Sequence, residues 1–265
     1  MSPPWWGWVG AAVAVMLSMA WAGTRRITTT RHRIGEPSGE RPLRLVHLTD
    51  LHLRTFDGLA RRVAGVAAAL EPDLLLLTGD AIHGPAGLHG LDALDRVLGR
   101  IGVGGFAVMG NEEYRMAVDP ERLRDTYARH GVRLLVNEAA PVETRLGTVA
   151  VVGLDAYHGR PEPRGPNGMR GSRMVVLGHQ PWLRYFFPSE DPGVPHWMVA
   201  GHTHGGQVRL PGWVPVVPPG TRETVGGWYR DRLPWLYVSR GIGTSGIPLR
   251  LFAPPEIAVF EWWPE

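Results

Sequence analysis

Polar side chains of the kinds that bind metal ions occur in five short clusters along the chain. Each cluster comes directly after a run of apolar residues of the kind that forms a buried strand. The clusters are Asp50-Leu51-His52, Gly79-Asp80, Gly110-Asn111, Gly178-His179 and Gly201-His202-Thr203-His204. Because the carboxyl ends of parallel strands meet at one edge of a sheet, we expect the five clusters to lie together. Carboxylates, imidazoles and an amide oxygen are ligands for divalent transition metals, so the pattern predicts a metal site.

Each cluster also has an ordinary structural explanation. Gly79-Asp80 and Gly110-Asn111 are common turn sequences when each is taken alone. His202 and His204 are two residues apart, which suits a metal site, but solvent-facing residues of a strand have the same spacing. The position of all five clusters at strand ends favours the metal site. Glycine beside four of the clusters lets the backbone turn sharply and approach an anion closely.

The elements that position these clusters alternate between strand and helix in the first part of the folded chain. Strand-like runs cover 43–49, 73–78 and 106–109, and helical patterns cover 57–70 and 91–100. Asp119, Pro120 and Glu121 are start signals for a further helix, which is expected to stop at Gly131. This alternation is typical of a buried parallel sheet.

After residue 131 the pattern changes to short strands with few helix signals. These runs cover 132–136, 148–154, 174–178, 197–201, 206–210, 236–240 and 257–261. A second sheet is therefore expected. We predict an α/β fold with two packed sheets and helices outside them. The chain has 265 residues, of which 44% are hydrophobic, and this is enough for one catalytic domain.

The composition excludes several kinds of site. The chain has no cysteine, which excludes disulfide frameworks, thiolate zinc sites and cysteine nucleophiles. All 28 basic residues are arginine, and the net charge of +3 is too small to indicate a nucleic-acid partner.

The N-terminal run from Trp5 to Gly23 has no charged residue and is long enough to cross a bilayer as a helix. Tryptophans lie at both of its ends, as in membrane-spanning helices. We predict a membrane anchor over residues 1–23, and the arginines that follow predict a cytoplasmic catalytic domain. A cleaved secretory signal, which would make the protein an exported one, and a buried apolar helix are the alternatives.

Residues 24–42 are polar, rich in arginine and broken by Gly35, Pro37 and Gly39. This composition predicts a linker between the membrane and a folded domain that covers residues 43–265.

The five clusters, taken in this order, resemble the motifs of the calcineurin-like metallophosphoesterase superfamily. The longer strings GHTHGGQVRLPG and LYVSRGIGTSGIPLRLFAPPEI resemble its membrane-associated branch, and the likeness extends from about Leu43 to the C-terminus. The resemblance implies a four-layer α-β-β-α fold, in which two mixed sheets are flanked by helices. This agrees with the expectation from the strand pattern.

The resemblance also implies two divalent metal ions, such as Mn, Fe or Zn, held by seven residues. Asp50, His52 and His204 would hold one ion. Asn111, His179 and His202 would hold the second, and Asp80 would bridge both. Catalytic roles are implied for Asn111, His202 and residue 112. The implied chemistry is an in-line attack on phosphorus by a water-derived hydroxide, without a covalent enzyme intermediate.

The sequence departs from the superfamily pattern after Asn111. Relatives usually have a histidine there, which contacts phosphate and assists the leaving group, whereas this chain has Glu112. Three consequences compete: activity is lost, Glu112 acts as a protonated acid, or the leaving group departs without help. The third suits a pyrophosphate bond, because phosphate is a weaker base than an alkoxide. We expect Glu112 to disfavour esters of simple alcohols.

A second departure lies between Tyr157 and Arg173. Relatives generally have a helix there, but the proline and glycine content of this segment predicts a loop.

Three apolar runs rich in aromatic residues lie near the metal motifs, at 182–187, 213–217 and 228–229. They could pack in the core or form an apolar rim that admits a lipid tail.

The predicted function is hydrolysis of a phosphodiester or pyrophosphate bond in a phosphorylated membrane lipid. One activity in the branch is the cleavage of UDP-2,3-diacylglucosamine to lipid X and UMP, in lipid A biosynthesis. The alternatives are a broad phosphodiesterase of phospholipids or cell wall, and a non-catalytic metal-binding scaffold. The sequence assigns no substrate-binding residue.

Overall fold

The structure is a computed structural model that describes residues 5–37, 39–99, 102–157, 173–188, 196–210, 212–219, 221 and 223–264. The α-helices are α1 (Trp5–Arg25), α2 (Gly58–Ala69), α3 (Leu88–Gly99), α4 (Asn111–Arg115) and α5 (Pro120–Ala128). Short 3-10 helices are η1 (Pro85–Gly87), η3 (Pro181–Phe186) and η4 (His204–Gly206).

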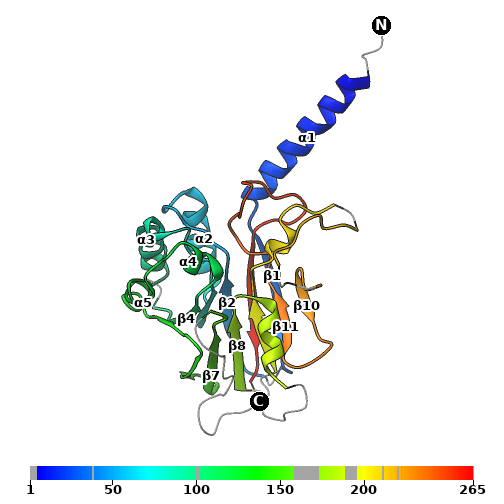
Figure 1. Cartoon of the computed structure of the whole chain (residues 1–265). Helices are drawn as coiled ribbons and strands as arrows, with labels where there is room; N and C mark the ends of the chain where they lie inside the picture. The colour runs from blue at the N-terminus through cyan, green and yellow to red at the C-terminus, as the bar shows by residue number, and fades with distance from the viewer. Residues whose placement is uncertain are drawn as a thin grey trace.

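Two six-stranded mixed sheets form the centre of the molecule (Figure 1). The first has the order β1-β12-β2-β3-β4-β5, with bounds Thr28–Ile34, Glu256–Trp262, Leu43–Leu48, Leu74–Thr78, Gly105–Val108 and Val132–Leu134. The second has the order β10-β11-β9-β8-β7-β6, with bounds Gly227–Tyr229, Trp235–Val238, Trp197–Ala200, Met174–Gly178, Gly147–Leu154 and Glu138–Thr144. Strands β2 to β5 are mutually parallel, as are β7, β8, β9 and β11.

Alternate residues of the strands face different layers. In β2, Val46 packs with the helices α2, α3 and α5 on the outside, whereas Leu45 faces the second sheet. Leu45 belongs to a core that includes Val151 and Val199 of the second sheet. On the outer face of the second sheet, Val176 packs with residues of η3. The α/β fold class, with two mixed sheets flanked by helices, is therefore confirmed.

The helix start signals act as the sequence predicts. The Asp57 carboxylate accepts hydrogen bonds from the backbone amides of Leu59 and Ala60, which caps α2. Asp119 caps α5 in the same way, with Pro120 at the first helical position.

Several details of the strand prediction are wrong, since β1, β6 and β10 lie outside the expected strand runs and one expected strand is not formed. Residues 206–210, expected as a strand, make only isolated bridges at Val208 and Leu210. The expected linker over 24–42 is wrong for residues 28–34, which form β1 and pair in parallel with β12. β1 lies at a sheet edge and carries few apolar residues, so its polar composition resembled a linker. The predicted loop between Tyr157 and Arg173 lies almost entirely outside the described residues.

Helix α1 projects from the end of the domain (Figure 1). It is long and apolar enough to cross a membrane, and Ala20 is its one buried residue. It is the candidate span within the described part of the chain. A signal sequence near the N-terminus can meet the same criteria of length and composition.

Candidate metal centre

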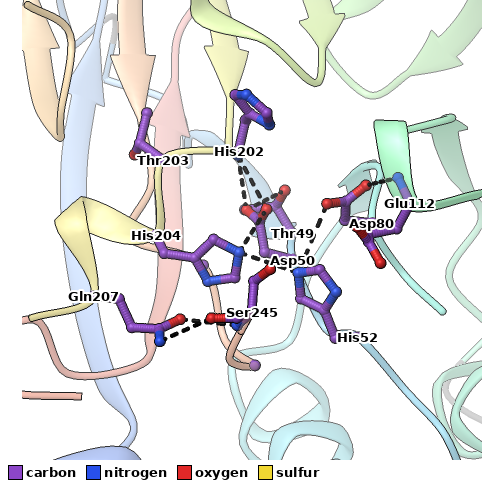
Figure 2. Close-up of polar contacts among 12 residues, drawn as sticks. Thr49, Asp50, His52, Asp80, Glu112, His202, Thr203, His204, Gln207 and Ser245 are labelled. Atoms are coloured by element: carbon purple, nitrogen blue, oxygen red, sulfur yellow. Dashed lines mark hydrogen bonds and ion pairs between the residues drawn. The ribbon is translucent and has the colours of Figure 1, made fainter. Parts of the chain in front are cut away.

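The five predicted clusters meet at the carboxyl ends of β2, β3, β4, β8 and β9, across the two sheets. Asp50, Asp80 and Asn111 follow strands of the first sheet, and His179 and His202 follow strands of the second. Figure 2 shows Asp50, His52, Asp80, His202 and His204 gathered around one space. The structure therefore brings together all seven residues that the sequence indicated as ligands.

Asp50, His52 and His204 form the first ligand group. Nε2 of His52 lies 3.1 Å from Nε2 of His204. Nε2 of His204 in turn lies 3.5 Å from Oδ1 of Asp50. Two ligand atoms about 2.1 Å from one ion are separated by roughly 3.0 to 3.4 Å at octahedral or tetrahedral angles. The distances in this group fit a single divalent ion.

Asn111, His179 and His202 form the second group. Nε2 of His179 lies 3.0 Å from Oδ1 of Asn111 and 3.2 Å from Nδ1 of His202. Oδ2 of Asp80 lies between the groups, 3.4 Å from Nε2 of His179 and 3.7 Å from Nε2 of His52. One carboxylate oxygen therefore faces both ligand groups.

The surroundings of His179 orient it as a metal ligand. Its Nδ1 lies 2.8 Å from the carbonyl oxygen of Thr78, so this nitrogen carries the proton and donates it. Nε2 is then the nitrogen that faces the centre and would bind a metal. The donor set, of carboxylates, imidazoles and one amide oxygen, fits divalent transition metals.

Burial and mutual electrostatic interaction shift the pKa values of the histidines and carboxylates in the centre. Burial would lower the pKa of His179, but the adjacent Asp80 and Asp50 outweigh it and raise this pKa to about 10. His202 is different, because burial and the positive His179 lower its pKa to about 4. Burial raises the pKa of Asp50 to about 6, whereas the charged His179 holds that of Asp80 below its usual range against the effect of burial.

Metal binding should therefore release protons. A ligating His179 must lose the proton from Nε2, and its raised pKa means that this proton is present at pH 7. We expect binding of Mn²⁺ at pH 7 to release about one proton from this side chain, and the apparent affinity to rise with pH. Calorimetric titration in two buffers with different ionisation enthalpies measures the release. Equal heats in both buffers would contradict this expectation.

The backbone is strained where it presents the ligands. Asp50, His52, Asp80, His202 and His204 all have positive φ, between 47° and 71°. Such conformations cost about 1 to 3 kcal/mol each and persist where the surrounding structure enforces them. Gly201 permits the close packing around Asp50, because a Cβ at position 201 would collide with Thr49 and with the Asp50 carboxylate.

Comparison with protein families identifies the family to which this chain belongs. The family model of the calcineurin-like phosphoesterases matches residues 43–206. The chain belongs to the calcineurin-like phosphoesterase family. It is thus a metal-dependent phosphoester hydrolase, and the two ligand groups described above fit the divalent metals of this family.

Several relatives of this phosphoesterase cover most of its length. The metallophosphoesterase YkuE of Bacillus subtilis is 29% identical over 252 residues, covering 88% of this chain and 85% of YkuE. The phosphodiesterase YaeI of Escherichia coli is 29% identical over 239 residues, covering 87% and 86%. The UDP-2,3-diacylglucosamine pyrophosphatase LpxG of Chlamydia muridarum is 25% identical over 279 residues, covering 82% of each chain.

Glu112 of this phosphoesterase is buried, and its carboxylate is paired. Arg115 donates from Nε and Nη2 to the two carboxylate oxygens, at 2.8 and 2.6 Å. Nδ1 of His83 lies 3.1 Å from Oε2. Both oxygens thus face donors, as is typical of an ionised carboxylate. The arrangement offers no support for Glu112 as a protonated acid.

Sequence reasoning missed His83, Arg115 and Glu113. His83 and Arg115 line a cavity of about 430 Å³ that also borders the metal ligand His52. Glu113 is fully buried, and its carboxylate accepts hydrogen bonds from the amides of Asp80, Ile82 and Gly110. The position of Glu113 three residues after the helix cap Gly110 was the available signal for its role. Nothing local in the sequence indicated the contact between His83 and Glu112.

Proposed function

We propose that this phosphoesterase hydrolyses a phosphodiester or pyrophosphate bond in a membrane lipid, with UDP-2,3-diacylglucosamine as the first candidate substrate. The observation that carries the proposal is the pair of ligand groups around Asp80, in a domain that is joined to an apolar helix long enough to span a bilayer. The similarity to LpxG supports this choice of substrate.

In this proposal, Asp50, His52 and His204 would hold one ion, and Asn111, His179 and His202 would hold the other. Asp80 would serve both, since its Oδ2 faces the two ligand groups. When bound, the two ions supply positive charge for the phosphoryl oxygens and activate the attacking water. The protein contributes rigid placement, since the strained backbone and the hydrogen bond from His179 to Thr78 fix the ligands before substrate arrives.

The leaving-group side of the centre is assigned to His83, in place of the histidine that the family usually has at position 112. Glu112 orients the His83 ring through Nδ1. In the doubly protonated ring, Nε2 also carries a proton, which it can donate to the leaving oxygen. Arg115 neutralises the charge of Glu112 and lines the cavity that would receive the substrate. This arrangement removes the repulsion that an unpaired carboxylate would exert on a phosphate.

The N-terminal helix gives the proposal its cellular setting. We propose that α1 is a membrane anchor and that the arginines after it keep the catalytic domain on the cytoplasmic side. Confinement to the bilayer surface raises the effective concentration of a lipid substrate. A broader phosphodiesterase that acts on other phospholipids is the competing function, supported by the similarity to YaeI.

The proposal is tested by UMP release from UDP-2,3-diacylglucosamine in detergent, with Mn²⁺ and the intact chain. We expect release by the intact protein and loss of release in His202→Ala, which removes one ligand. If metal-loaded protein hydrolyses a soluble phosphodiester but releases no UMP, the substrate assignment fails and the broader phosphodiesterase is favoured.

A further inference from the structure

A second cavity, of about 570 Å³, lies beside the metal ligand His204 and is lined almost entirely by apolar atoms. Val208, Val216, Val217 and Ile247 contribute side chains to it. The mechanism proposed above does not use this cavity. It differs from the cavity next to His83, which borders the same centre but contains charged side chains.

The apolar cavity is built on a segment that is tied to the base of α1. Gln207 connects the two loops that line the cavity, because its Nε2 donates a hydrogen bond to the carbonyl oxygen of Ile247 at 2.8 Å. The backbone on both sides of residue 208 pairs with Leu251, whose amide donates to the Gln207 carbonyl and whose carbonyl accepts from the Arg209 amide, both at 2.9 Å. The preceding residue, Arg250, donates a hydrogen bond from its backbone amide to the Thr24 hydroxyl in α1 at 2.8 Å. Gly23 packs so closely on the Arg250 carbonyl that a side chain there would collide with it.

Arg250 also connects this segment with the metal centre. Its side chain is fully buried and donates to the carbonyls of Gly243, Arg240 and Ala253. Its Nη2 lies 3.2 Å from Nδ1 of His204. The base of the apolar helix, the cavity and a metal ligand therefore belong to one continuous rigid unit.

The surface around this cavity is apolar and exposed. Trp213 is 60% exposed, Val216 74%, Ile247 52% and Phe252 58%. In Figure 1 the loops that carry these residues, coloured yellow and red-brown, lie at the same end of the domain as α1. Exposed apolar residues gathered at one end of a soluble domain mark a contact with a membrane or a partner. Of these two alternatives, the attachment of α1 favours the membrane, because a helix that spans the bilayer places its own base at the bilayer surface.

We infer that the loops formed by residues 207–210, 212–219 and 245–252 contact the bilayer, and that the apolar cavity takes an acyl chain of the lipid substrate. The lipid would then present its phosphate to the centre at His204 while its chain passes directly from the bilayer into the cavity. Extracting a free lipid into water would expose every methylene of that chain, which this route avoids. The bilayer contact rests on the proposed membrane anchor α1, and the acyl-chain part rests in addition on the proposed lipid substrate.

The bilayer contact is tested by site-directed spin labelling, which the absence of native cysteine makes specific. Val216→Cys and Phe252→Cys place labels on the apolar surface. Tyr185→Cys in η3 is the matched control, because Tyr185 is also exposed but η3 packs along the outer face of the second sheet, away from the base of α1. In full-length protein in phospholipid vesicles, we expect labels at 216 and 252 to be accessible to oxygen and protected from a nickel chelate. Equal nickel access at all three positions would overturn the contact.

The acyl-chain site is tested by Ile247→Asp and Val216→Asp, with Tyr185→Asp as the control. Because these positions are exposed, the fold tolerates a charge there. We expect hydrolysis of a long-chain lipid substrate in vesicles to fall at least about tenfold, with hydrolysis of bis(p-nitrophenyl) phosphate changed less than about twofold. Undiminished lipid hydrolysis, or equal losses on both substrates, would overturn the site. If the unmodified chain hydrolyses only the soluble ester, the proposed function fails, and the spin labels still decide the bilayer contact.

Discussion

Replacement of Asp80 by asparagine is expected to lower turnover by at least about 10³-fold while the protein stays folded. Oδ2 of Asp80 faces both ligand groups, so it is the position where one negative charge serves two ions. Oδ1 accepts the backbone amide of Glu112 at 2.7 Å, and an asparagine oxygen can keep that hydrogen bond. The substitution therefore removes the shared charge and preserves the local structure. Metal content by mass spectrometry and turnover on bis(p-nitrophenyl) phosphate measure the effect.

Asp95→Asn is the matched control for this experiment. Asp95 is also buried, but its carboxylate has no hydrogen-bond partner among the described residues, and burial raises its pKa well above the usual value. Burial thus favours the uncharged acid, which asparagine replaces with little change in charge or shape. We expect Asp95→Asn to retain both metal content and turnover. Full activity in Asp80→Asn would show that the two ligand groups do not share this carboxylate.

His83→Ala is expected to have an effect that depends on the leaving group. If His83 donates to the leaving oxygen, its loss should cost about 10²-fold for a phosphodiester with an alkoxide leaving group. A pyrophosphate or a p-nitrophenyl ester, whose leaving group is a weak base, should lose less than about threefold. The ratio of kcat/KM values for the two kinds of substrate, in His83→Ala and in the unmodified protein, measures this difference.

His89→Ala is a suitable control, because His89 is exposed on α3 and lies outside the cavity beside His52. Glu112→Gln extends the test, since it keeps the shape of the partner of His83 and removes its charge. We expect it to weaken alkyl ester hydrolysis in the same direction as His83→Ala. Equal losses on both kinds of substrate in His83→Ala would indicate a structural role for His83 and would refute its assignment to the leaving group.

The sequence predicted that the five clusters lie together, because this placement follows from topology. Parallel strands such as β2, β3 and β4 end at one edge of their sheet, and a polar residue just after such a strand has few other places to go. The helix caps were equally predictable, since Asp57 and Asp119 act on amides two or three residues away. In each case the relevant contact is set by local chain geometry.

Contacts between distant segments were not predictable in this way. The role of His83 depends on its approach to Glu112, which is set by how the loop after β3 packs on α4. The strand β1 was hidden because an edge strand needs few apolar residues. Arg250 appeared as one of many arginines, and only the fold shows that it is buried between α1 and His204.

The pairing of β1 with β12 has a consequence for how the protein is made. β1 leaves the ribosome before the other described strands, and its ladder partner β12 spans residues 256–262. Until β12 has been translated, the segment after α1 has no strand to pair with. Only a chain that extends through β12 can dock β1, and with it the helix, onto the enzyme. Prematurely terminated chains would leave α1 attached by an unpaired tether, which proteases could cut.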